Sequence, residues 1–149
     1  MKLEEAIKTS NFKNELHKAS INLLYTTWWL KTPVSKGLKQ LDFTQEQFNV
    51  MRILKGKHPQ PMSVKDIASR MIEQNSNVPR IVDKLEIKKW ISRGQCPNDG
   101  RHTKIVLSDL GIAKLKAASE YVESMTAQLI NLNTEEAKQL NYLLDKLKA

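Results

Sequence analysis

The sequence is poor in the features that mark secreted, membrane-spanning and disulfide-stapled proteins. Its 149 residues include one cysteine, Cys96, which cannot close an intrachain disulfide, so nothing requires an oxidising compartment. No apolar run approaches the roughly 18 residues that predict a membrane span. The first residues, MKLEEAIK, place acidic side chains where a signal peptide needs an apolar core. We therefore expect a single-domain cytoplasmic protein.

Residue patterns for catalysis and metal binding are also missing. There are five glycines, and they form no glycine-rich phosphate loop. No Ser/His/Asp, Cys/His or paired-carboxylate arrangement is recognisable. The histidines, His17, His58 and His102, are too scattered to indicate a metal site. The sequence predicts neither an enzyme nor a resident cofactor, and a redox-sensor role for Cys96 is only a minor alternative.

Positive charge is what the chain has in excess. Its formal net charge is +8 and its pI is about 9.6, a balance that fits nucleic acid, an anionic membrane or simple solubility. About half of this net charge falls in about a fifth of the chain, which is typical of a nucleic-acid footprint. Between residues 76 and 104, the basic side chains are Arg80, Lys84, Lys88, Lys89, Arg93, Arg101 and Lys104, against Asp83, Glu86 and Asp99.

Apolar residues at helical spacing predict a long first helix over about residues 4–31. Leu16, Leu23 and Leu30 fall seven apart and give this helix an apolar stripe. Pro33 is expected to end it, because the residue before a proline is pushed out of the helical region. A short helix then fits residues 35–40.

Three shorter helices are predicted next. Thr44 and Ser63 each stand three residues before a partner, Gln47 and Asp66, which predicts a capping box at the start of two helices. A third helix begins near Ser76. Its buried positions are expected to be Val78, Ile81, Val82 and Leu85.

The remaining pattern predicts a hairpin and two more helices. Strands over residues 90–95 and 103–107 flank a turn that contains residues 97–100. Ser108 is expected to cap a helix that reaches about residue 131, and Thr134 to cap the last one. The predicted fold class is mainly α with a small β-hairpin wing: a winged helix-turn-helix framed by long N- and C-terminal helices.

The third short helix is the candidate recognition helix. In a helix-turn-helix the second helix lies in the major groove, where Asn and Arg make bidentate contacts to bases and Ser and Lys suit phosphates. An ordinary amphipathic helix with a solvated charged face is the alternative. The exposed side is expected to carry Ser76, Asn77, Pro79, Arg80, Asp83 and Lys84.

The hairpin supplies a second candidate contact. Asp99 can hold the nearby Arg101 extended, so that the guanidinium reaches a narrow minor groove. The alternative is a weak exposed ion pair, worth at most about 1 kcal/mol.

Together these segments resemble the MarR family, the multiple-antibiotic-resistance-type bacterial transcription regulators. Asp99 and Arg101 fall on the family's D-x-R signature, and Leu107, Ser108 and Gly111 on the L-T-x-x-G that follows. The resemblance is specific over about residues 40–112 and architectural for the terminal helices. The matching segments are FTQEQFNVMRIL, SVKDIASRM, SNVPRIVDKLE, Arg93 and DGRHTKIVLSDLG.

The resemblance implies a homodimer that binds pseudo-palindromic duplex DNA, usually as a repressor. Residues 1–40 and 112–149 would be dimerisation helices, and residues 41–111 the DNA-binding lobe. Lys89 stands where the family usually has glycine. With the patterns above, the implied DNA-binding residues are Ser76, Asn77, Pro79, Arg80, Lys84, Arg93, Asp99, Arg101, His102 and Thr103.

The resemblance also implies an effector site between the dimerisation helices and the DNA-binding lobe. Tyr25, Trp28 and Met51 are the expected contacts for a small aromatic or anionic effector, because aromatic side chains dominate such sites. Packing in the core or at a dimer interface is the alternative role for these residues. Two alternatives for the whole protein stay open: a winged-helix protein–protein interaction module without sequence-specific DNA binding, and a regulator that has lost its ligand pocket.

Overall fold

The computed structural model describes the backbone of residues 1–96 and 99–149, and the side chains of residues 1–94 and 104–149. Its elements, in chain order, are α1 (Leu3–Ile7), α2 (Glu15–Gln40), α3 (Gln45–Lys57), α4 (Val64–Ala68), α5 (Val78–Ile87), β1 (Ile91–Cys96), β2 (Asp99–Leu107), α6 (Asp109–Leu129) and α7 (Thr134–Leu147).

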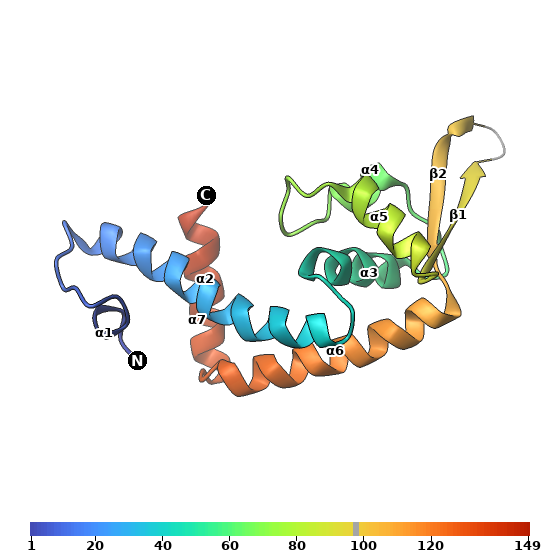
Figure 1. The fold of residues 1–149 in the computed structure, drawn as a ribbon. Helices are drawn as coiled ribbons and strands as arrows, with labels where there is room; N and C mark the ends of the chain where they lie inside the picture. The colour runs from blue at the N-terminus through green and yellow to red at the C-terminus, as the bar shows by residue number, and fades with distance from the viewer. Residues whose placement is uncertain (97–98) are drawn as a thin grey trace.

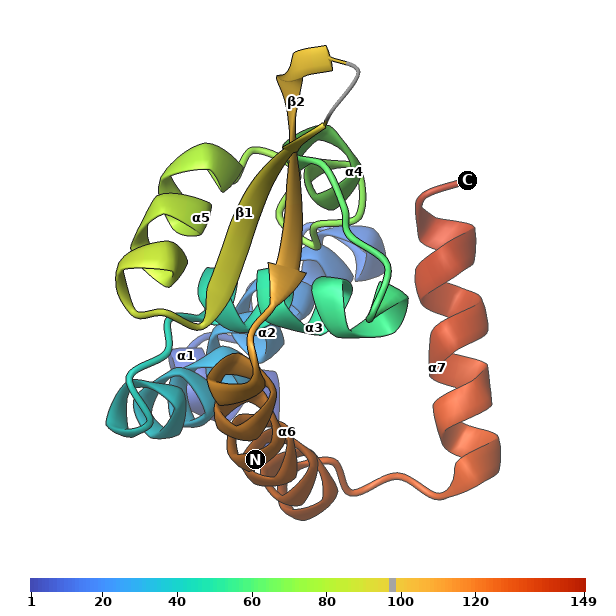
Figure 2. The ribbon, with the colours of Figure 1, turned by 90° about the vertical axis from the view of Figure 1, so that its right-hand side faces the viewer.

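The elements form a lobe of short helices with a hairpin, which packs on two long helices. Helices α3, α4 and α5 and the β1–β2 hairpin make the lobe, while α2 and α6 pack against each other beneath it (Figure 1). The other end of the molecule carries α1 and α7, and Figure 2 shows α7 standing apart from the lobe. This arrangement confirms the predicted winged helix-turn-helix with long terminal helices.

One hydrophobic core holds the lobe together. Val50, Met51 and Leu54 of α3 are buried at its centre, where α5, α6 and the hairpin converge. Met62, just before α4, exchanges two backbone hydrogen bonds with Ile105 of β2, at 2.9 and 2.8 Å between nitrogen and oxygen. The base of the hairpin is therefore fixed to the helical part of the lobe.

The predicted helix starts at Thr44, Ser63 and Ser108 are confirmed. The side-chain oxygen of Thr44 accepts a hydrogen bond from the Gln47 amide at 3.0 Å. The Ser63 and Ser108 hydroxyls likewise accept from the amides three residues further on, those of Asp66 and Gly111. The last helix differs by one residue, because Asn133 and not Thr134 is its cap. These starts are local features, since cap and partner lie within one turn.

The prediction that Pro33 ends the first helix is wrong. Helix α2 runs without interruption through Pro33, and residues 3–7 form the separate α1. Packing against α6 holds this part of α2: the Tyr121 hydroxyl donates to the Pro33 carbonyl at 2.9 Å. Gly37 makes this approach possible, because a Cβ there would lie 1.8 Å from the Tyr121 ring. Tertiary packing therefore overrides the local preference.

The hairpin is longer than predicted. Its strands pair antiparallel from Ile91 opposite Leu107 outwards, with a register shift after Gln95. Asp99 and Gly100, which were expected in the turn, belong to the backbone of β2. Pro97 and Asn98 lie outside the described residues.

Helix α5 ends in a tight left-handed turn that leads directly into β1. Lys89 has a φ of 64°, a conformation that glycine adopts most easily. The Lys89 and Trp90 amides donate to the carbonyls of Glu86 and Leu85, and these hydrogen bonds cap the C-terminus of α5. The geometry thus explains why a glycine would suit position 89. Gly111 is required nearby, because a Cβ would lie 1.9 Å from the Trp90 carbonyl oxygen.

Candidate nucleic-acid interface

Helix α5 is anchored by its buried face and presents a polar face to solvent. Val78, Val82 and Leu85 are buried against the core, as predicted, whereas Ile81 is only half-buried. Pro79 and Arg80 are exposed on the first turn, and that turn contains no acidic residue. The partial positive charge of the helix N-terminus is therefore left available to an anion such as phosphate.

Arg80 and Lys84 are the exposed cations of α5. They lie four residues apart and so share one side of the helix. Within the part of the chain that the structure describes, neither side chain forms an ion pair. Both are placed to meet a nucleic-acid duplex without first giving up an internal partner.

Ser76 and Asn77 hold the N-terminus of α5 in place. The Asn77 side-chain oxygen accepts from the Arg80 amide at 3.2 Å, and Asn77 is thus the helix cap. The Ser76 hydroxyl donates to the Glu73 carbonyl at 2.8 Å. Because the Asn77 side-chain oxygen already accepts this hydrogen bond, the NH₂ group is the part of the side chain left to contact a base.

Arg93 is engaged in ion pairs with α5. From β1, its Nε donates to Glu86 at 2.9 Å, and its Nη2 pairs with Asp83. Partial burial acts to lower the pKa of Arg93, but the hydrogen bond and charge of Asp83 and Glu86 outweigh it, so the pKa lies above its ordinary value. We call these two ion pairs the Arg93 bridge.

The predicted wing contacts Asp99, Arg101, His102 and Thr103 lie in β2, but their side chains are outside the described residues. Their contact with DNA stays a prediction.

A second group of cations, which the sequence patterns did not single out, lies beside α4. Hydrogen bonds from Ser63 lower the pKa of Asp66, and the nearby charges of Arg70 and Lys104 lower it further. Both cations are exposed, as is Lys65 on α4. None of the three was among the predicted DNA contacts, although the first helix of such a motif crosses the DNA backbone.

A largely apolar cavity of about 400 Å³ lies between the long helices α2 and α6 and the lobe. A second hollow of about 420 Å³ adjoins it, under the segment before α5. Residues that line both are Leu30, Lys31, Gln45, Asn49 and Ile72. Asn49 is 7% exposed, and its Nδ2 is buried without a hydrogen-bond partner in the described structure. Because that nitrogen is buried, the polar lining of the first cavity comes from side chains such as Lys31, Gln45 and Arg52.

The residues expected to bind an effector do not line these hollows. Tyr25 and Trp28 pack on each other with ring centroids 5.6 Å apart, and Trp28 is 59% exposed on α2. Met51 is fully buried in the core. The cavity lies where the resemblance implied a site, but its described walls come from other residues.

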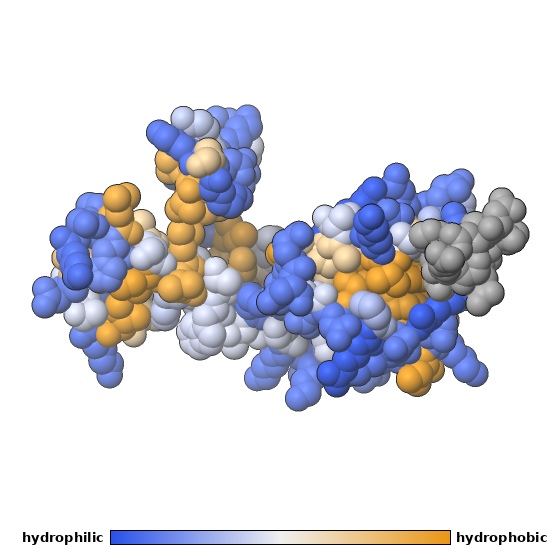
Figure 3. Space-filling view, turned by 90° about the horizontal axis from the view of Figure 1, so that it is seen from above, coloured by the Kyte–Doolittle hydropathy of each residue, from blue (hydrophilic) through white to orange (hydrophobic). Residues whose placement is uncertain are grey.

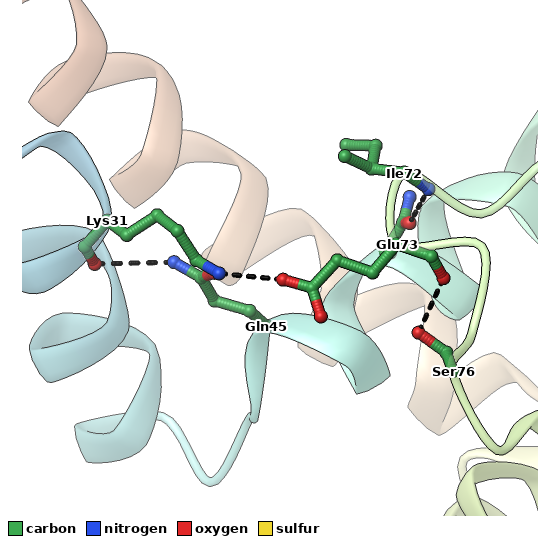
Figure 4. Close-up of polar contacts among 6 residues, drawn as sticks. Lys31, Gln45, Ile72, Glu73 and Ser76 are labelled. Carbon is green, nitrogen blue, oxygen red and sulfur yellow. Dashed lines mark hydrogen bonds and ion pairs between the residues drawn. The ribbon is translucent and has the colours of Figure 1, made fainter. Parts of the chain in front are cut away.

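One ion pair connects the wall of the cavity to the segment that precedes α5. Lys31 Nζ of α2 lies 2.7 Å from a carboxylate oxygen of Glu73, and Gln45 donates to the Lys31 carbonyl at 3.3 Å (Figure 4). The main-chain carbonyl of Glu73 accepts from the amide and hydroxyl of Ser76. Glu73 thus contacts the wall of the cavity and the residue that precedes the cap of α5.

Among the described residues, no group of three or more His, Cys, Asp or Glu side chains is arranged to hold a metal ion. None of the described helices meets the length and hydropathy of a membrane span.

Comparisons with known proteins agree with this geometry. The model of the MarR family matches residues 43–103, which run from the residue before the Thr44 cap into the hairpin. A relative from Bacillus subtilis, the uncharacterized HTH-type transcriptional regulator YkoM, is 30% identical over 109 residues. The match covers 72% of this chain and 70% of the relative.

Solved structures share the fold. The structure of MepR from Staphylococcus aureus in a DNA complex superposes with a TM-score of 0.78 at 26% identity, over 86% of this chain and 94% of MepR. A cysteine-to-serine mutant of MarR from Escherichia coli, complexed with operator DNA, also gives 0.78, at 24% identity over 93% of this chain and 99% of that one. This second likeness concerns the fold alone.

Proposed function

The chain belongs to the MarR family of transcription regulators, and we propose that it is a homodimeric repressor that binds a pseudo-palindromic DNA operator. In each subunit α5 enters the major groove and the hairpin follows the adjacent minor groove. The observation that carries the proposal is the outward face of α5, where Arg80 and Lys84 are exposed beside a helix N-terminus without acidic residues. Occupation of an inverted repeat inside a promoter would exclude the polymerase.

A binding assay on the DNA upstream of the chain's own gene tests this function. A labelled upstream duplex should be retained by the full chain and released by the same unlabelled duplex, but not by a shuffled one. The winged-helix interaction module predicts instead that α5 binds an acidic protein partner and that both duplexes compete equally weakly. Equal competition would reject the sequence-specific regulator.

Three substitutions separate base contacts from phosphate contacts. Arg80→Ala and Arg101→Ala should each weaken operator binding by about 1–3 kcal/mol per contact and relax sequence preference. Lys84→Ala should weaken binding to every duplex alike and reduce the salt dependence. Fluorescence anisotropy with operator and shuffled duplexes measures both effects, and an unchanged melting temperature is the control. Normal affinity of the Arg101 variant would remove the hairpin from the mechanism.

We further propose that a small aromatic or carboxylic effector binds in the cavity between α2, α3 and α6 and relieves repression. Its apolar walls suit a ring, while Lys31 and Arg52 suit an anionic group. The contacts of Glu73 with Lys31 and Ser76 support a route to the start of α5. An effector shifts binding only through unequal affinity for the two states.

Salicylate and benzoate serve as first probes. At saturation either should weaken operator binding by about 5–150-fold, the usual range of coupling between two sites. Ser119→Phe, which fills the cavity, should abolish this response, whereas Trp28→Leu, outside it, should keep it. If Trp28→Leu abolished the response and Ser119→Phe kept it, the effector site would lie at the exposed aromatic residues of α2. If no anion of a broad panel changed operator binding, the chain would be a regulator that has lost its ligand pocket.

A further inference from the structure

The position of the Arg93 bridge points to a role other than the DNA contact expected from the sequence. We propose that Arg93 is a positioning residue that fixes the orientation of α5 against the hairpin, and thereby sets operator selectivity. This inference rests on the proposed DNA-binding function. It concerns how one subunit aims its recognition helix.

The geometry of the bridge joins two elements that both face the duplex. Arg93 lies on β1, opposite Ile105 of β2, on a strand whose base is fixed to the lobe. Its carboxylate partners, Asp83 and Glu86, are three residues apart and so lie on one side of α5. A planar guanidinium can bind two carboxylates at once through different nitrogens, which a lysine ammonium does with less geometric definition.

The bridge leaves Arg93 poorly placed to bind phosphate. Nε and Nη2 are each held by a carboxylate, and the Arg93 side chain is 26% exposed, against 63% and 47% for Asp83 and Glu86. A phosphate at either nitrogen would have to displace a carboxylate that α5 keeps nearby. Within the described chain, Arg80 and Lys84 have no carboxylate partner that a phosphate would have to displace. The two cations of α5 therefore differ from Arg93, which is already paired.

Asp83 is the partner through which the bridge controls recognition. It directly precedes Lys84 and follows Arg80 by three residues, so it stands within the exposed face of α5. Fixing Asp83 to β1 limits rotation of α5 about its axis, and with it the direction of Arg80 and Lys84. The same contact neutralises carboxylate charge that would otherwise face the DNA backbone, where like charges repel.

Selectivity distinguishes positioning from phosphate binding. The test uses the full chain and two duplexes: the one that the wild type enriches most from a random-sequence pool, and a shuffled version of it. Arg93→Ala should weaken binding to both duplexes, because Asp83 and Glu86 lose their neutralising partner, but the selected duplex should lose roughly tenfold more than the shuffled one, the discrimination of about one base contact. Lys84→Ala is the matched control, expected to weaken both duplexes and reduce the slope of affinity against salt.

The partner residues provide a second, independent variant. Asp83→Asn with Glu86→Gln removes the bridge but keeps Arg93, so binding to shuffled DNA should rise while the preference for the selected duplex falls. If Arg93 instead bound phosphate, Arg93→Ala would weaken both duplexes equally, and the double variant would gain on both with selectivity intact. Either result overturns the inference. Arg93→Lys should lie between wild type and Arg93→Ala.

Two controls keep the outcomes separate. Circular dichroism checks that each variant is folded, and the double variant carries the test if Arg93→Ala is not. A wild type that enriches no duplex would reject the proposed function, and this inference with it, before any variant is made.

Discussion

Raising the salt concentration from about 50 to about 200 mM should weaken operator binding by a thousandfold or more, if the dimer engages roughly six phosphates. Each phosphate that a Lys or Arg neutralises releases condensed counterions, and the affinity falls as a power of the salt concentration. The exposed cations of one subunit that can take part include Lys65, Arg70, Lys84 and Lys104. Two subunits therefore supply enough contacts for this steep dependence.

Fluorescence anisotropy over a series of potassium chloride concentrations gives the slope directly. Heparin provides the comparison, because it is an anionic polymer without base pairs. A nearly flat dependence, or equal binding to heparin and operator, would contradict the proposed interface.

Separating the two subunits should weaken operator binding by about a hundredfold to ten-thousandfold, because the second half-site would no longer be held at high effective concentration. The dimer is expected at the terminal helices. Helix α7 has no buried residue, and its Leu140, Leu143 and Leu147 are 44%, 56% and 60% exposed on one side. Figure 3 shows apolar side chains gathered over the terminal helices, at the end away from the hairpin. Apolar surface of this kind usually marks an interface.

The paired substitution Leu143→Asp and Leu147→Asp tests this expectation. Sedimentation should show the wild type as a dimer at micromolar concentration and the variant as a monomer. Tyr142→Asp is the matched control, because Tyr142 is also exposed but lies on the other side of α7, so the dimer and its operator affinity should persist. A wild-type monomer, or a monomeric variant with full operator affinity, would contradict the dimer.

Features that depend on neighbours within one turn were predictable from the sequence. The caps at Thr44, Ser63 and Ser108 need only a side-chain oxygen and an amide three residues on, and all three are present. The fold class followed because such local starts, the apolar spacing and the hairpin signal occur in a definite order. Family motifs added the expectation of a DNA-binding regulator.

Features that depend on distant contacts were not predictable. Helix α2 continues through Pro33, where it packs against α6 and where the Tyr121 hydroxyl, 88 residues away, donates to the Pro33 carbonyl. The ion pairs of Arg93 were not predictable either, because a sequence shows its charge but not the carboxylates that α5 brings to it. The cavity likewise combines residues of α2, α3 and α6 with Ile72, so an aromatic stripe within α2 alone was a poor guide to its position.

Helix α6 joins both halves of the proposed mechanism in one rigid body. Its first turn is fixed at the base of the hairpin, where the Ser108 hydroxyl donates to the Lys89 carbonyl and Gly111 abuts Trp90. Its 21 residues extend about 30 Å from there towards the dimerisation end. A tilt of about 10° at that pivot would displace the far end by roughly 5 Å, more than the rise of about 3.4 Å between successive base pairs. In the proposed dimer, small changes in how the two subunits meet would therefore be magnified into different half-site spacings, and the length of α6 would set which inverted repeats one dimer can span.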